Sequence, residues 1–189
     1  MTSRIQRRRA GAPTHRRRGQ ALPEFALILP VLALILLSII QLGFIFAAQV
    51  GITNAVREAA RLAAVTSPTL DSVQATSNGD KVYFDLTNTT TGFLKRNVFA
   101  YSSGNLVVSG SPETQVCYQS FIDSSNKPAV TVKVEAYYRH PLFIPLIGAL
   151  LDGLDGTPND GFRVGATEEM RVENDEITAP FSLGLTCAT

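Results

Sequence analysis

The sequence predicts an α+β protein with a long N-terminal helix, a single transmembrane span in that helix, and a β-rich extracytoplasmic head. Three observations lead to this fold class. Seven arginines precede Gly19, no charged side chain occurs between residues 25 and 56, and residues 129–138 alternate between apolar and polar side chains. The first two patterns are typical of a membrane anchor, and the third is typical of a half-buried strand.

The uncharged run supplies the span. Residues 26–48 are almost wholly apolar, and the hydrocarbon core of a bilayer needs about 20 apolar residues of helix. Pro23 is suited to the first turn of a helix, where its missing N–H would have no partner. Pro30 lies inside the run, and membrane helices tolerate proline there when neighbours satisfy the released carbonyl. The run therefore predicts one transmembrane helix.

The arginines set the expected orientation. The topogenic cluster includes Arg16, Arg17 and Arg18, and the first basic residue beyond the span is Arg57. The positive-inside rule therefore places the N-terminus in the cytoplasm and the rest of the chain outside. Beyond residue 19, ten basic residues face sixteen acidic ones. The resulting charge of about −6 argues against nucleic acid as a partner of the main body.

The helix should continue past the membrane to residue 65, because residues 49–65 contain no proline and are rich in alanine. Arg57 and Arg61 fall on one face of this extension, and Ser67 with Pro68 should end it. The candidate helix-packing residues are these two arginines and four small residues, Gly43 and Ala47 in the bilayer and Ala55 and Ala59 outside it. The small residues could allow another helix to approach closely. Two interpretations stay open here, namely packing against another helix and packing on the chain's own domain.

A short motif lies at the start of the span. Gly19 is followed by Gln20, and then by Glu24 and Phe25. An acid at bilayer depth costs roughly 2.5–3.5 kcal/mol on insertion scales, so such residues are functional candidates. A secretory signal has a shorter apolar region, although residues 46–48 offer a poor small-residue cleavage site, so release by signal peptidase stays open as a minor alternative. The residues after the arginines do not continue as a twin-arginine signal. Cleavage after Gly19 on the cytoplasmic side accounts for the whole motif, since glycine lets the backbone extend into a protease cleft.

With this motif in view, residues 16–65 resemble the TadE family, the minor pseudopilins of the tight-adherence (Flp) pilus machinery of bacteria and archaea. The specific parts are residues 24–27, Pro30 and residues 54–61, which read NAVREAAR. Two departures are visible. Gln41 replaces an acid often found before the mid-helix glycine, and an alanine at 59 or 60 stands where a second glycine is common.

The resemblance implies processing by a prepilin peptidase between Gly19 and Gln20, with Glu24 and Phe25 in peptidase recognition and assembly. It also implies partnership with the lipid bilayer, other pilin-like subunits and the Tad assembly machinery. The expected domains are a cleaved leader (residues 1–19), a TadE-like helix (20–66) and an extracytoplasmic α+β or β-rich domain (67–189). The alternative is a signal-anchored extracytoplasmic binding or adhesion protein that is not incorporated in a filament.

Strand patterns dominate the outer domain. We expect strands at residues 106–108, 129–138 and 162–172, while residues 71–93 could hold a short helix or a strand. Residues 141–148 are broken by prolines and are interpreted as a loop packed on the core, or as a membrane-facing or partner-facing patch. The tail from residue 179 is expected to be loosely held unless Cys187 ties it down.

Nothing in the sequence indicates catalysis or a cofactor. Cys117 and Cys187 fall on the oxidising side of the membrane, where a disulfide or two thiols are both compatible with the sequence. The two histidines have no ligand spacing with these cysteines, so no metal site is predicted. Residues 152–160 are rich in aspartate and glycine, but their spacing does not fit an EF-hand. The chain is therefore interpreted as an enzyme's substrate and not as an enzyme.

Overall fold

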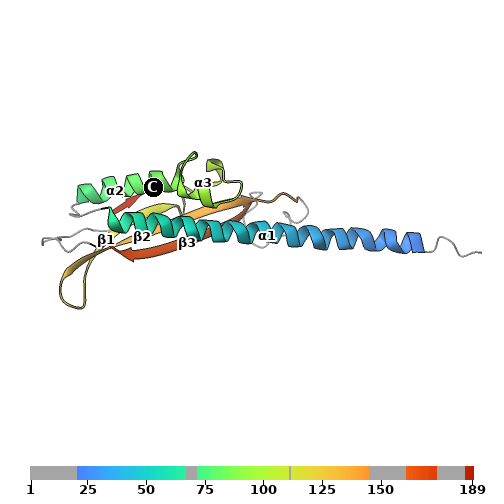
Figure 1. Cartoon of the computed structure of the whole chain (residues 1–189), viewed down its shortest axis with the longest axis horizontal. Helices are drawn as coiled ribbons and strands as arrows, with labels where there is room; N and C mark the ends of the chain where they lie inside the picture. The colour runs from blue at the N-terminus through green and yellow to red at the C-terminus, as the bar shows by residue number, and fades with distance from the viewer. Residues whose placement is uncertain (1–20, 67–71, 111, 145–160, 174–185) are drawn as a thin grey trace, which may run out of the picture. The chain divides into compact units, whose positions relative to one another are not determined.

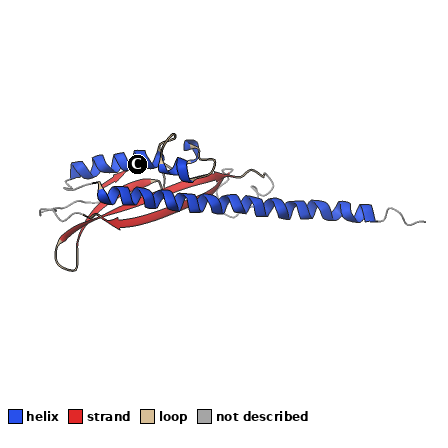
Figure 2. Cartoon of the chain, in the orientation of Figure 1, coloured by secondary structure: helices blue, strands red, loops and turns tan. Residues whose placement is uncertain are grey.

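The computed structural model describes residues 21–66, 72–110, 112–144, 161–173 and 186–189 (Figure 1). Three helices precede an antiparallel sheet, which confirms the α+β class (Figure 2). The helical elements are α1 (Ala21–Val65), α2 (Ser72–Thr87), α3 (Phe93–Asn97) and the 3₁₀ turn η1 (Ser103–Asn105). The strands are β1 (Gln115–Ile122), β2 (Pro128–Pro141), β3 (Gly161–Arg171) and β4 (Thr186–Ala188). The predicted leader, residues 1–19, lies outside the described residues.

The chain divides into two compact units, one ending at Leu37 and the other beginning at Ser38. In the first unit, the described residues 22–37 of α1 expose their side chains all round the helix. Leu22–Val65 is the one stretch in the described part of the chain that is long and apolar enough to cross a membrane. A helix that presents leucine and isoleucine on every side requires an apolar surrounding, so this finding suggests membrane anchoring.

The second unit is built on a four-stranded antiparallel sheet in the order β3-β2-β1-β4. The strands predicted at 129–138 and 162–172 are present as β2 and β3. The β1–β2 hairpin turns at residues 123–127, where Asp123 Oδ1 accepts hydrogen bonds from the backbone N–H groups of Ser125 and Lys127. Asn126 adopts a φ of 56° in this turn, a conformation that asparagine tolerates better than most residues.

The core of this unit lies between one face of the sheet and α1 from residue 38 onward. The apolar side of β2 is fully buried, as its alternation predicts, through Val130, Val132, Val134, Ala136 and Tyr138. From α1, Ile52 and Val56 join the same core, together with a row of buried alanines. Hydrogen bonds also join the two layers: Gln49 Nε2 donates to Gly165 O at 2.8 Å, and Tyr118 Oη donates to Ala63 O at 3.3 Å. Small side chains on α1 therefore bring its backbone close to the strands.

Three expectations are changed or settled. Residues 106–108 are not a strand: Leu106 forms only an isolated bridge with Tyr138, and Gly110, at a φ of 116°, is where a bend leads the chain away. The undecided segment around residues 82–86 is helical, because Val82 and Leu86 are four residues apart and both are buried. At the C-terminus, Thr186–Ala188 pairs with β1 as a fourth strand, so these residues are held in the sheet.

Candidate functional site: helix α1 and the segments it holds

The predicted processing motif is only partly within the described residues. Gly19, Gln20, Arg16, Arg17 and Arg18 lie outside them. Glu24 occupies the first turn of α1, and Phe25 is 59% exposed. An acid in the first turn interacts favourably with the positive end of the helix dipole. The structure thus presents Glu24 and Phe25 on an accessible helix start.

The predicted small-residue positions separate into two groups. Ala55 and Ala59 are 0% exposed and belong to the core of the second unit. Gly43 and Ala47 face outward, and a Cβ at position 43 would meet nothing within 4 Å. Of the two interpretations for the outer alanines, the structure places them against the chain's own domain. Of the four predicted small-residue positions, Gly43 and Ala47 are accessible to a second helix.

The two predicted arginines lie on the exposed side of α1. Arg57 Nε is 3.6 Å from Glu168 Oε2, in an ion pair between α1 and β3. Arg61 is exposed in the next turn. Exposed ion pairs contribute about 0–1 kcal/mol, because water and salt screen them. Arg57 therefore aligns the helix with β3 and adds little to the free energy of unfolding.

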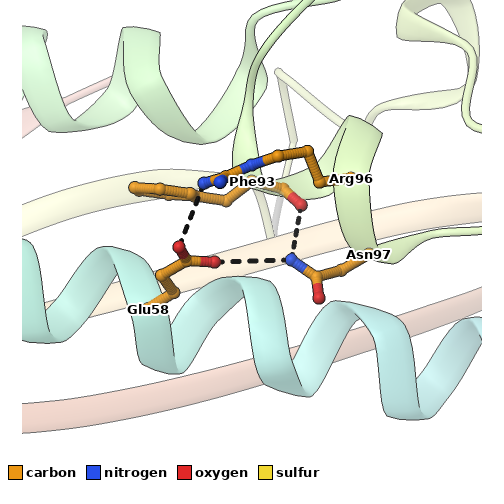
Figure 3. A network of polar contacts seen from close by, with 4 residues as sticks. All are labelled: Glu58, Phe93, Arg96 and Asn97. Carbon is orange, nitrogen blue, oxygen red and sulfur yellow. Dashed lines mark hydrogen bonds and ion pairs between the residues drawn. The ribbon is translucent and has the colours of Figure 1, made fainter.

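Glu58 holds α3 against α1, a role that the sequence pattern did not predict (Figure 3). Glu58 Oε1 accepts a hydrogen bond from Arg96 Nη2 at 3.0 Å, and Asn97 Nδ2 lies 3.5 Å from Glu58 Oε2. The Arg96 guanidinium also lies over the Phe93 ring, 5.0 Å from its centroid. An ion pair and a cation–π contact on one guanidinium restrict its rotamers. The acid of the NAVREAAR segment is thus used to position a short helix.

A glycine in α1 makes the close approach of α3 feasible. At Gly51, an added Cβ would overlap the carbonyl oxygen of Asn97 and would lie 2.9 Å from its carbonyl carbon. Both obstructing atoms belong to the backbone, so they cannot move aside as a flexible side chain would. Gly51 and Glu58 together fix where the C-terminal end of α3 crosses α1. The sequence signal for this contact was an isolated glycine in a helical pattern.

A polar residue inside the apolar run contacts the end of β2. Gln41 is fully buried, and its Oε1 accepts a hydrogen bond from Phe143 N at 3.1 Å. The Phe143 ring packs edge-on against His140, with 5.9 Å between ring centroids. Burial lowers the pKa of His140, because desolvation disfavours the imidazolium form. Gln41 therefore has a structural partner just beyond the end of β2.

The outer face of the sheet carries a polar cluster around Glu135. This carboxylate is 7% exposed and contacts Lys133 Nζ at 2.8 Å, Gln115 Nε2 and Thr167 Oγ1 at 3.4 Å. Burial raises the pKa of Glu135, but the hydrogen bonds from Lys133 and Gln115 outweigh it, so the net pKa is lowered. The contacts come from three adjacent strands and are structural in character.

Cys117 and Cys187 are joined by a disulfide between directly paired residues of β1 and β4. The bridge spans 70 positions of sequence. Closing a loop of that length restricts the unfolded chain and holds the C-terminal strand in the sheet.

In the described part of the chain, one helix is long and apolar enough to cross a membrane, and an antiparallel sheet follows it in sequence; this combination suggests a membrane-anchored protein. Residues 19–61 match the family model described as TadE-like protein. The match confirms the resemblance to the TadE-like family over these residues, and it suggests involvement in the Tad pilus system. No curated protein and no solved structure matches the chain. The sheet lies outside the matched residues.

Proposed function

We propose that this chain is a membrane-anchored TadE-like pseudopilin that takes part in assembly of a Tad/Flp-type pilus after processing by a prepilin peptidase. The observation that carries the proposal is the start of the match. It begins at residue 19, and α1 with its first-turn Glu24 begins two positions later. A cleavage after Gly19 would therefore leave a mature chain that is helical almost from its first residue.

Hydrolysis at this position changes the charge of the chain as well as its length. Water adds across the Gly19–Gln20 peptide bond, which leaves a carboxylate on Gly19 and an α-ammonium on Gln20. The seven leader arginines depart with the leader. The mature N-terminus then carries one positive charge four residues before Glu24.

Assembly would use these two charges. In an apolar helix bundle, the Glu24 carboxylate of one subunit pairs with the Gln20 ammonium of its neighbour, because an unpaired charge there is strongly unfavourable. Gly43 and Ala47 supply the accessible small-residue face for helix packing. Ala55 and Ala59 are occupied by the chain's own core. The second unit would then lie on the extracytoplasmic side, in accordance with the arginine distribution.

The second candidate is a signal-anchored extracytoplasmic binding or adhesion protein that never enters a filament. It is favoured by the extent of the family match, which ends at residue 61 and leaves the sheet without a family counterpart. In that case residues 1–19 would be retained, and Glu24 would serve only as a helix-start acid.

The deciding experiment is the intact mass and N-terminal sequence of the membrane-bound protein, with and without a co-expressed Tad-type prepilin peptidase. We expect a start at Gln20 that depends on the peptidase. Gly19→Val should block cleavage, whereas the matched leader variant Gly11→Val should be processed normally. A retained leader in the presence of the peptidase favours the signal anchor, and a start beyond residue 48 indicates secretion by signal peptidase.

A second variant separates processing from assembly. Glu24→Gln removes the carboxylate that would pair with the Gln20 ammonium, so we expect normal cleavage and loss of co-assembly with pilin-like subunits. Glu58→Gln is the matched control, because it removes an acid of the same helix outside the bundle.

Intact mass also reports whether the N-terminal Gln20 has cyclised. Pairing with Glu24 predicts an uncyclised terminus, and loss of one ammonia would contradict it.

A further inference from the structure

Three phenylalanines from distant parts of the sequence form an exposed cluster in the second unit. Phe44 of α1 stacks on Phe99 with 5.5 Å between centroids and meets Phe143 edge-on at 5.9 Å. Phe99 is 59% exposed and Phe143 is 53% exposed. We call these three residues the Phe cluster. Half-exposed aromatic rings gathered in one place indicate a surface that meets an apolar partner.

The position of the cluster along α1 identifies the partner. A helix needs about 20 residues to cross a hydrocarbon core, and a span of that length that begins at Phe25 ends at Phe44. Gln41, still within the apolar run, accepts the hydrogen bond from the backbone of Phe143. The cluster therefore lies within about one helical turn of the expected exit of the span, which falls between residues 44 and 48. Apolar and aromatic side chains at that depth lie in the boundary between acyl chains and headgroups.

Two arginines of the sheet lie near the same turn of α1 as the Phe cluster. Arg139 of β2 and Arg163 of β3 are directly paired in register, so their side chains share one face of the sheet, the outer face that also carries Glu135 and lies opposite the core. Both are exposed, and in the described part of the chain neither is within ion-pair distance of a carboxylate. Like charges in a cross-strand pair repel each other. An anion that contacts both guanidinium groups would relieve the repulsion.

The hydrogen bond between Gln49 and Gly165 shows which turn of α1 lies beside the arginine pair. Arg163 precedes Gly165 by two residues, a distance of roughly 7 Å along a strand. The same distance along α1 is about four or five residues of helix before Gln49. Arg163 is therefore level with Ile45 or Phe44, next to the expected boundary of the bilayer.

We propose that the Phe cluster and the arginine pair Arg139–Arg163 together form a phospholipid-binding surface. The two guanidinium groups bind the phosphate of an anionic headgroup, which their planar donors match in geometry. Phe99 and Phe143 enter the interfacial region from the core side of the sheet, and the arginine pair enters it from the outer side. The surface would hold the sheet against the membrane. The inference rests on membrane anchoring by α1, and it requires neither cleavage at Gly19 nor incorporation in a filament.

The first test uses the absence of tryptophan from the sequence. Full-length Phe99→Trp and Phe143→Trp variants are reconstituted in phosphatidylglycerol–phosphatidylcholine liposomes with and without brominated lipid. We expect bromine to quench both fluorophores. Phe121→Trp is the matched control: it is 40% exposed and pairs with Ala129, at the opposite end of β2 from Arg139. It should remain unquenched.

The second test measures binding of phosphatidylglycerol to the full chain in detergent by native mass spectrometry. Arg139→Gln and Arg163→Gln should each weaken binding roughly fivefold, the contribution of one basic residue near an anionic membrane surface. Arg171→Gln is the control, since it removes the same charge from the far end of β3. Equal affinity for all three variants would overturn the assignment.

Flotation of the liposomes separates the possible failures. A chain that does not float with the liposomes contradicts the anchoring on which the proposed function rests. A chain that floats while the Phe99→Trp and Phe143→Trp fluorophores escape bromine contradicts only the lipid surface. If those fluorophores are also shielded from aqueous acrylamide, a second copy of the chain covers the cluster, and the lipid assignment is wrong.

Discussion

Gln41 Oε1 accepts a hydrogen bond from the backbone N–H of Phe143 at 3.1 Å, across 102 positions of sequence. The donor lies just after β2, and the acceptor lies inside the apolar run of α1. Gln41 is fully buried, and a buried polar group without a hydrogen-bond partner is expensive. Gln41 is a polar residue in an otherwise apolar segment, and this hydrogen bond holds the end of β2 against the helix.

We expect Gln41→Leu to release the segment after β2. Removing the acceptor leaves the Phe143 N–H unpaired, at a cost of about 1–3 kcal/mol. Hydrogen exchange of the peptide containing residues 141–144 in the detergent-solubilised protein should accelerate. Gln41→Glu keeps an acceptor oxygen in the same place and should preserve protection. Equal exchange in both variants would show that this hydrogen bond does not hold the segment.

Gly51 and Gly43 form a matched pair of substitutions in one helix. Gly51→Ala should lower the free energy of unfolding by about 1–3 kcal/mol, because the new methyl group overlaps the backbone of Asn97. Gly43→Ala meets no neighbouring atom and should raise helix stability by up to about 1 kcal/mol. Thermal unfolding in detergent measures both. Similar shifts for the two variants would contradict the close contact between α1 and α3.

The Glu58–Arg96 pair is suited to a double-mutant cycle. The two side chains are 46% and 53% exposed, so the coupling energy between Glu58→Gln and Arg96→Gln should be only about 0.2–1 kcal/mol. Loss of the cation–π contact should make Arg96→Gln the more destabilising of the two single variants. Denaturant unfolding of the four proteins gives the coupling, and its decrease in high salt would identify it as electrostatic.

Acid should destabilise the sheet through Glu135. The pKa of this carboxyl is lower in the folded chain than its ordinary value of 4.5. The unfolded chain therefore binds its proton first as pH falls, and the contribution to stability is present above about pH 4.5 and lost as pH falls through the folded pKa. Glu135→Gln should flatten the pH dependence of unfolding below that value. Equal slopes below that pH for the original chain and the Glu135→Gln variant would contradict this account.

Part of the acid sensitivity should survive in the Glu135→Gln variant. The backbone N–H of Lys127 is the main reason that the pKa of Asp123 is also lowered in the β1–β2 turn. A pH profile with no remaining slope would show that the Asp123 turn contributes nothing to the acid response.

Reduction of the Cys117–Cys187 disulfide should release β4. Removing the constraint on the unfolded chain lowers stability by about 2–4 kcal/mol in the loop-entropy account. The melting temperature should fall on addition of reductant, and the peptide containing residues 186–188 should lose protection from hydrogen exchange. A Cys117→Ala, Cys187→Ala double variant should show the same melting temperature with and without reductant.

Elements with a regular pattern of apolar and polar side chains were predictable from the sequence, and elements held by single long-range contacts were not. The apolar composition of residues 26–48 predicted α1, and the alternation of residues 129–138 predicted β2; both predictions are confirmed. Leu106 and Val107 looked like a strand, yet a neighbouring turn limits them to one bridge. The interaction of Glu58 with α3 depends on a partner 38 positions away, and no local pattern carries that information.

The apolar span, the charge asymmetry and the family resemblance could be recognised from the sequence, because they depend on local composition that any fold would retain. Which faces of α1 are buried follows from tertiary packing. Burial of Ala55 and Ala59 against the chain's own sheet and exposure of Gly43 both arise from where the strands pack on the helix. The same packing brings Phe44, Phe99 and Phe143 together. Such contacts join distant segments, and their energies depend on three-dimensional proximity that a linear pattern does not specify.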